Sequence, residues 1–112
     1  TRPGVARGPH EHRDQTDLFC FAGPGTFKLY LWDNREGSPT YDRKMVVIAG
    51  EDEKRAVSIP PGVVHAYLVV SDHDGLVVNL PNRLYAGKGK AEPVDEIRWE
   101  EEEDAATPFK LD

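Results

Sequence analysis

The sequence predicts an all-β fold, and two observations lead to that prediction. Short runs rich in Val, Ile, Phe and Tyr are separated by clusters of Gly, Pro, Asn and Asp, which are the residues of turns. No stretch with helical periodicity is long enough to build a helix. Strands of this length, with turns at regular spacing, are typical of a sandwich or barrel.

The expected elements follow the chain in order. Residues 1–8 are rich in Pro, Gly and Arg and predict a lead-in segment or loop. A tight turn is expected at Pro60-Pro61-Gly62, because proline fixes φ and lacks a backbone donor, and glycine adopts positive φ. Strands are expected at residues 18–22, 26–32, 41–49, 55–59, 63–70 and 76–80, with a further short strand at 97–99.

Length and composition argue against several classes of protein. The length of 112 residues predicts one domain, residues 1–112. The net charge of −6, with no basic stripe, argues against nucleic-acid binding. No apolar run approaches the ~20 residues of a membrane helix, and no signal-peptide pattern is present. The single Cys20 excludes a disulfide framework within the chain, so we expect a cytoplasmic protein.

Two separate segments carry histidines in a chemically suggestive pattern. His10 and His12 are two residues apart, so they would share one face of a strand, and Asp17 follows five residues after His12. His65 comes just after the proline turn, where a rigid element would hold it in place. The alternative for the first pair is a polar loop with exposed histidines. For His65 the alternative is a half-buried histidine beside a hairpin turn.

The pattern His10-x-His12, Asp17 and Pro60-x-Gly62-x-x-His65 resembles the two-motif signature of the cupin superfamily. Asp17 stands where that signature usually has glutamate. The resemblance implies an antiparallel jelly-roll barrel whose mouth brings the two motifs together. Three imidazoles and a carboxylate suit one divalent transition metal such as Zn, Fe, Mn or Ni, and the ligands in this interpretation would be His10, His12, Asp17 and His65.

A second resemblance covers nearly the whole chain. Residues 3–10, 59–67 and 95–99 are similar, in order, to segments of the dTDP-4-dehydrorhamnose 3,5-epimerase family. That family consists of cupins that epimerise nucleotide-linked 4-keto-6-deoxy sugars without a metal or other cofactor. The resemblance implies a nucleotide-sugar substrate and a homodimer formed by strand exchange, with the family's N-terminal strands absent from the residues given.

The same resemblance implies roles for individual residues. His10 corresponds to the catalytic base of the family's Arg-Gly-x-His motif, and Tyr85 is the nearest candidate for the acid. Arg7 and His65 correspond to substrate-binding positions. Arg83, close to Tyr85 in the chain, is predicted to bind substrate as well.

Several positions depart from the family pattern. Glu101 stands near the place of an aspartate that supports the base, and residues 17–21 lack the family's lysine. His12 is an additional histidine, and without a metal we expect repulsion to lower the pKa of His10 or His12. Three hypotheses therefore stay open: a sugar-nucleotide epimerase, a metal-binding cupin, and a sugar-binding relative without catalysis.

Overall fold

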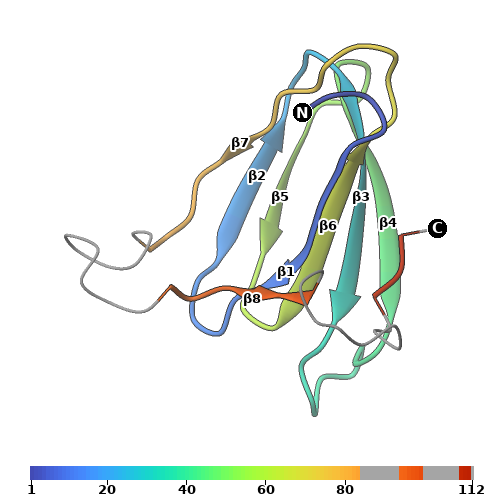
Figure 1. The fold of residues 1–112 in the computed structure, drawn as a ribbon. Helices are drawn as coiled ribbons and strands as arrows, with labels where there is room; N and C mark the ends of the chain where they lie inside the picture. Colours follow the sequence, from blue (N-terminus) through green and yellow to red (C-terminus); the bar gives the residue numbers. More distant parts are fainter. Residues whose placement is uncertain (84–93, 100–108, 112) are drawn as a thin grey trace.

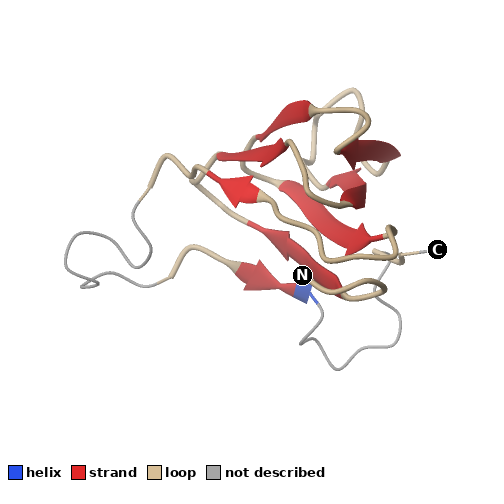
Figure 2. Ribbon diagram, turned by 90° about the horizontal axis from the view of Figure 1, so that it is seen from above, coloured by secondary structure: helices blue, strands red, loops and turns tan. Residues whose placement is uncertain are grey.

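Strand pairing in this chain produces two antiparallel sheets. The computed structural model describes residues 1–83, 94–99 and 109–111. One sheet has the strand order β4-β3-β6-β1-β8 and the other β5-β2-β7; Figures 1 and 2 show them from two directions. Every strand pair among the described residues is antiparallel, which confirms the predicted all-β class. The bounds are β1 Ala6–Glu11, β2 Asp17–Phe21, β3 Thr26–Asp33, β4 Lys44–Gly50, β5 Arg55–Ile59, β6 Val63–Val69, β7 Val78–Asn79 and β8 Ile97–Arg98.

The predicted strands match the observed ones where alternation is strong. Strands β2, β3, β5 and β6 begin and end within one residue of the prediction. The predicted start of β4 at residue 41 was wrong, because backbone hydrogen bonds from Ser38, Tyr41 and Arg43 to carbonyls three residues earlier keep the chain in turns. The predicted loop at residues 1–8 was wrong from Ala6 onward, since pairing with β6 draws this segment into the sheet.

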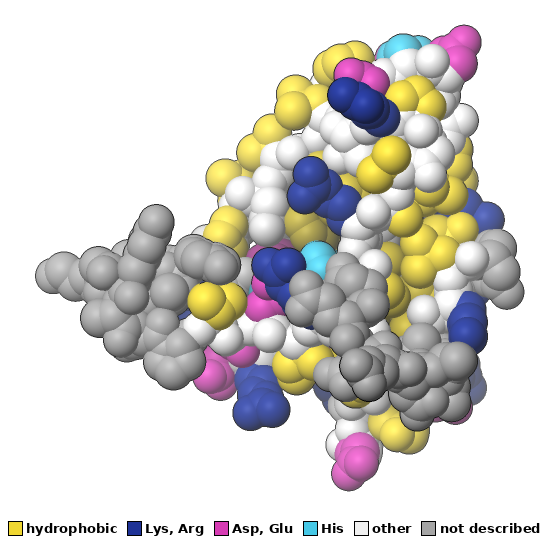
Figure 3. Space-filling model, viewed as in Figure 1, with side chains coloured by type: hydrophobic (Ala, Val, Ile, Leu, Met, Phe, Trp, Pro, Cys, Tyr) yellow, Lys and Arg dark blue, Asp and Glu magenta, His cyan; other side chains and the backbone are white. Residues whose placement is uncertain are grey.

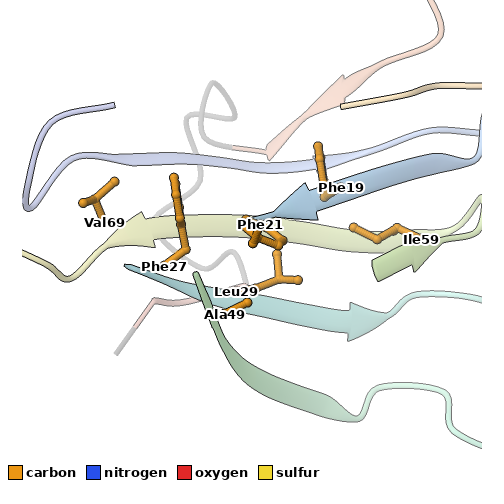
Figure 4. Packing of buried hydrophobic residues seen from close by; sticks show 7 residues of the cluster. All are labelled: Phe19, Phe21, Phe27, Leu29, Ala49, Ile59 and Val69. Carbon is orange, nitrogen blue, oxygen red and sulfur yellow. The ribbon is translucent and has the colours of Figure 1, made fainter. Parts of the chain in front are cut away.

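The main core lies between the two sheets (Figure 4). Alternate residues of each strand point inward, as the two-residue period of a strand requires. Each large side chain buried in this way contributes roughly 1.5–3 kcal/mol relative to exposure. The cluster consists of Phe19, Phe21, Phe27, Leu29, Ala49, Ile59 and Val69.

A second apolar cluster covers the outer face of the larger sheet. Tyr30 and Trp32 point outward from β3, with their rings stacked 6.0 Å apart at 11°. Phe109 packs edge-on against Trp32, at 5.6 Å between ring centroids. Phe109, near the C-terminal end of the chain, therefore helps to cover a sheet face that would otherwise be exposed to solvent. Across the described ranges, no helix is long and apolar enough to span a membrane.

Asp33 organises the long connection between β3 and β4. Its carboxylate accepts hydrogen bonds from the backbone N, Nε and Nη2 of Arg35 at 3.0, 2.8 and 3.0 Å. Ser38 Oγ donates at 2.6 Å, and Thr40 Oγ1 also donates to the same carboxylate. The Arg35 guanidinium, followed by the two hydroxyls, holds the pKa of Asp33 well below its usual range despite partial burial.

We expect Asp33→Asn to destabilise the fold by about 1–2 kcal/mol at pH 7, because charge-assisted hydrogen bonds are lost while the half-exposed Arg35 is partly screened by solvent. Since the pKa of Asp33 is lower in the folded state, its stabilisation is present above the ordinary value of ~3.9 and is lost as the pH falls below it. Urea unfolding at pH 7 and at pH 3 measures both effects.

Asp42→Asn is the matched control, because Asp42 is exposed in the same loop and its φ of 69° suits asparagine. Equal stability of the Asp33→Asn and Asp42→Asn proteins at pH 7 would contradict this account of the loop.

Candidate active site

Three histidines gather on the inner side of the larger sheet. Strands β1 and β6 pair so that His10 lies directly opposite His65, with the two rings 6.4 Å apart at 87°. His12 follows the end of β1, and its ring lies 5.5 Å from that of His65. The structure therefore brings the histidines of the two sequence motifs into one cluster.

Gly8 lets β1 approach β6 closely enough to form this cluster. The register of the pair shifts between Arg7 and His10, and Gly8 has a φ of 97°. A Cβ atom at Gly8 would lie 2.6 Å from the carbonyl oxygen of His65, too close for any other residue without movement of the backbone. This close contact gives a steric reason for glycine at the second position of the Arg-Gly-Pro-His segment.

A buried carboxylate links two of the histidines. Asp17 Oδ2 lies 3.0 Å from His12 Nε2 and 3.4 Å from His65 Nε2, and the Asp17 side chain is 1% exposed. Gln15 Nε2 donates to the other carboxylate oxygen at 2.7 Å. Candidate ligand atoms of His12, Asp17 and His65 all lie within 4.8 Å of one another. Among the described residues, that group does not include His10, which departs from the predicted four-ligand set.

The second ring nitrogens fix the tautomers of the buried pair. His65 Nδ1 lies 3.1 Å from the carbonyl oxygen of Val63, and His12 Nδ1 contacts the carbonyl oxygen of Asp95. A carbonyl oxygen only accepts hydrogen bonds, so both Nδ1 atoms carry the proton. In their neutral forms, both Nε2 lone pairs are therefore directed at the Asp17 carboxylate.

Burial and pairing set the charges of the buried cluster. Burial lowers the pKa of His65 to about 4, only partly offset by Val63 and Asp17, so it is neutral at pH 7. Burial would also lower the pKa of His12, but hydrogen bonds to Asp17 and Asp95 raise it overall. Burial would raise the pKa of Asp17, yet His12 and Gln15 lower it. The expected lowering at His10 or His12 was wrong for His12; it is found at the more deeply buried His65.

His10 lies at the edge of this cluster and has a different partner. Its Nδ1 is 3.3 Å from Glu96 Oε1, and the side chains are 22% and 16% exposed. Glu96 immediately precedes β8, which pairs with β1. His10 is thus the most exposed of the three histidines.

Asp95 ties the segment that contains β8 to the site, and the sequence analysis did not single it out. Its carboxylate accepts hydrogen bonds from the backbone N–H groups of Arg13, Asp14 and Gln15, at 2.8, 2.9 and 2.9 Å. These bonds lower its pKa although partial burial acts in the opposite direction. The one feature of the sequence that could have indicated Asp95 was its place in the segment 95–99, which is similar to a segment of the epimerase family.

The other predicted site residues are Arg7, Arg83, Tyr85 and Glu101. Arg7 is exposed on β1 opposite Tyr67, a half-buried tyrosine that the sequence analysis also overlooked. Burial raises the pKa of the Tyr67 hydroxyl, with a smaller opposing effect of Arg7. Arg83 is exposed at the end of a described segment. Tyr85 and Glu101 lie outside the described residues. Figure 3 shows a histidine reaching the surface beside Lys and Arg side chains.

Comparison with known proteins identifies the family. The family model described as dTDP-4-dehydrorhamnose 3,5-epimerase matches residues 1–105. The chain belongs to this family. Over 86 residues it is 34% identical to a probable low-salt glycan biosynthesis epimerase, Agl13 of Haloferax volcanii, covering 76% of this chain and 54% of that relative. The chain thus spans about half the length of the curated relatives it matches.

Solved structures of the family share the fold. A dTDP sugar isomerase from Desulfovibrio desulfuricans superposes with a TM-score of 0.80 at 28% identity, covering 98% of this chain and 66% of that one. ChmJ, a 3'-monoepimerase from Streptomyces bikiniensis in complex with dTDP-quinovose, gives 0.73 at 27% identity, with coverages of 88% and 47%. These likenesses agree with the expected cupin jelly-roll fold.

We expect Asp95→Ala to destabilise the protein by roughly 1–2 kcal/mol, because three hydrogen bonds to one carboxylate are lost while the freed amides are partly solvated. Hydrogen exchange should speed up at the amides of Arg13, Asp14 and Gln15. Asp14→Ala is the control, since the exposed neighbouring carboxylate has no such role. Unchanged exchange at these three amides in Asp95→Ala would refute the anchoring role.

Proposed function

We propose that this chain epimerises a nucleotide-linked 4-keto-6-deoxy sugar by removing a proton next to the ketone. The observation that carries the proposal is the placement of His10. It lies in the Arg-Gly-Pro-His segment of an epimerase-family chain, opposite His65, partly exposed and beside a carboxylate. An imidazole in such a place suits a general base, because its ordinary pKa is close to neutral.

The proposed reaction needs no oxidant and no second substrate. The ketone acidifies the neighbouring carbon, so His10 takes the C–H proton while the electron pair moves into an enolate. Reprotonation of that carbon on the opposite face by an acid completes the inversion. Tyr85 is the proposed acid, on the strength of the family resemblance, and it lies outside the described residues.

Two exposed arginines are proposed to bind the diphosphate of the substrate. The planar guanidinium of Arg7 is suited to a diphosphate, and its position on β1 is three residues from His10. Arg83 stays in the proposal as a second cation. Both ring nitrogens of His65 face protein atoms, so we assign it a supporting role behind the substrate rather than direct binding. The dTDP-quinovose bound to ChmJ supports the substrate class.

A metal site is a second candidate function for the buried cluster. Both imidazoles direct Nε2 at the Asp17 carboxylate, so a positive charge must lie between these groups. A proton on His12 satisfies this requirement, and so does a divalent cation bound by His12, Asp17 and His65. Two Nε2 atoms with Nδ1–H groups held by carbonyls, plus one carboxylate, form a donor set typical of zinc or iron sites. A metal there would act as a Lewis acid beside His10.

We expect His10→Asn to lower the rate of solvent deuterium incorporation into dTDP-4-keto-6-deoxyglucose by roughly 10²–10⁴-fold, because the general base is removed. NMR of the sugar in deuterated water measures the rate. His73→Asn is the matched control, since His73 lies in an exposed turn.

Retained exchange in His10→Asn would contradict the assignment of the base. If the natural protein binds the substrate without any exchange, the sugar-binding alternative takes the place of the epimerase.

The metal candidate predicts about one equivalent of Zn or Fe per chain in protein purified without chelators, measured by mass spectrometry. His12→Ala should abolish it, because one of three ligands is lost, and His73→Ala should not. Added Co²⁺ should give the visible absorption of a tetrahedral site. If the protein contains no metal and added Co²⁺ gives no such absorption, the metal candidate fails. The positive charge between His12, Asp17 and His65 is then a proton on His12.

A further inference from the structure

An irregularity in the pairing of β1 with β6 gathers polar side chains on the inner face of the larger sheet. Arg7 lies opposite Tyr67 and His10 lies opposite His65, so three steps along β1 match two steps along β6. Residues three apart on a regular strand point to opposite faces, whereas opposite residues of a pair share one face. Because both β6 residues contact Phe19 in the core, the irregularity turns Arg7 and His10 toward the inner face.

The ring of Tyr67 is held in place by aromatic side chains of the core. Its centroid lies 5.4, 5.9 and 6.5 Å from the rings of Phe27, Phe19 and Phe21, each at a steep interplanar angle. The ring of Phe19 also lies 5.5 Å from that of His65. Close packing on several sides restricts the ring to few orientations, so its hydroxyl is carried on a rigid support beside the histidines.

The hydroxyl group of Tyr67 is not used by the protein itself. Within residues 1–83, 94–99 and 109–111 it has no hydrogen-bond partner, although the side chain is half-buried. A tyrosine buried to this extent usually has a partner for its hydroxyl, so an unpaired one beside a candidate site indicates a ligand. Burial raises the pKa of this hydroxyl, which therefore keeps its proton at neutral pH and is a donor.

Neighbouring polar groups are already engaged with protein atoms. His12 and His65 each direct Nε2 at Asp17 and Nδ1 at a backbone carbonyl oxygen. Gln15 Nε2 donates to the same carboxylate at 2.7 Å. Of these groups on the described part of the chain, only Tyr67 presents a neutral donor to a substrate.

We infer that the Tyr67 hydroxyl donates a hydrogen bond to the keto oxygen of the sugar and stabilises the enolate. This inference rests on the proposed function and adds a catalytic residue to it. His10 Nε2 takes the C–H proton, the electron pair of that bond moves toward the ketone, and negative charge develops on its oxygen beside Tyr67. The hydroxyl keeps its proton, and the ketone forms again when the acid protonates the carbon. A fixed donor at the place where charge develops is an effective way to stabilise an oxyanion.

The relative places of His10 and Tyr67 suit these two tasks. Tyr67 is two residues from His65 on β6, so it is the diagonal neighbour of His10 across the strand pair. Diagonal neighbours lie about 7–8 Å apart, within reach of long and aromatic side chains. The carbon that loses its proton and the keto oxygen are only two bonds apart, so one sugar can meet both groups. The apolar rings around Tyr67 strengthen a hydrogen bond made there, because they lower the local dielectric constant.

The test removes the Tyr67 hydroxyl and keeps the ring. For Tyr67→Phe we expect kcat for deuterium exchange into dTDP-4-keto-6-deoxyglucose to fall roughly 10²–10³-fold with little change in KM, because the donor acts mainly as charge develops. Carbon NMR of the sugar labelled at C4 gives a second readout, in the His10→Asn protein, which should not convert it. The resonance of the bound keto carbon should move upfield when Tyr67→Phe is added, since its hydrogen bond is lost.

Tyr41→Phe is the matched control. Tyr41 is exposed in the connection between β3 and β4, so loss of its hydroxyl should leave kcat within about twofold. If the natural protein exchanges deuterium and Tyr67→Phe keeps its full kcat, the inference is overturned. If the natural protein binds the sugar without exchange, the proposed function fails, and the C4 resonance decides the contact: an unchanged resonance in Tyr67→Phe overturns the inference as well.

Discussion

A buried carboxylate joins the two sheets where the side chains of the candidate site gather. Asp17 begins β2 in the smaller sheet, whereas His65 lies on β6 in the larger one. The Asp17 carboxylate accepts a hydrogen bond from Gln15 Nε2 and, when His12 carries a proton on Nε2, another from His12, so this buried group has partners. Because leaving such groups unpaired costs far more than the net gain of a typical hydrogen bond, this contact constrains the spacing of the sheets at the site.

The segment 94–99 is the second determinant of the site, and each of its anchors acts on a different element. Asp95 caps the backbone after β1, Trp99 is held by Glu11, and Glu96 faces His10. This six-residue segment thereby closes the edge of the larger sheet and completes the surroundings of the proposed base. These contacts give a structural reason for the similarity between this segment and the corresponding segment of the family.

The site combines two histidine environments of different character. His65, opposite His10 on the neighbouring strand, is neutral, is held through Nδ1 by the Val63 carbonyl, and directs Nε2 at Asp17. His10 is partly exposed and has a carboxylate on one side. Burial disfavours the charged form of an imidazole, which is why the pKa of His65 is low. The same residue type therefore occupies two environments: His65 is buried inside, and His10 lies at the rim, where we propose that it acts as the base.

The sequence by itself determined the strand pattern, the Pro-Pro-Gly turn before His65 and the family, because alternation and turn chemistry are local and the motifs are contiguous. It did not determine the late start of β4, which depends on the hydrogen bonds around Asp33. Nor could it identify Asp95 and Glu96, since both meet their partners across more than 80 residues of chain. The antiparallel register of β1 and β8 brings Glu96 to the face of His10, because a shift of one residue reverses the faces of a strand.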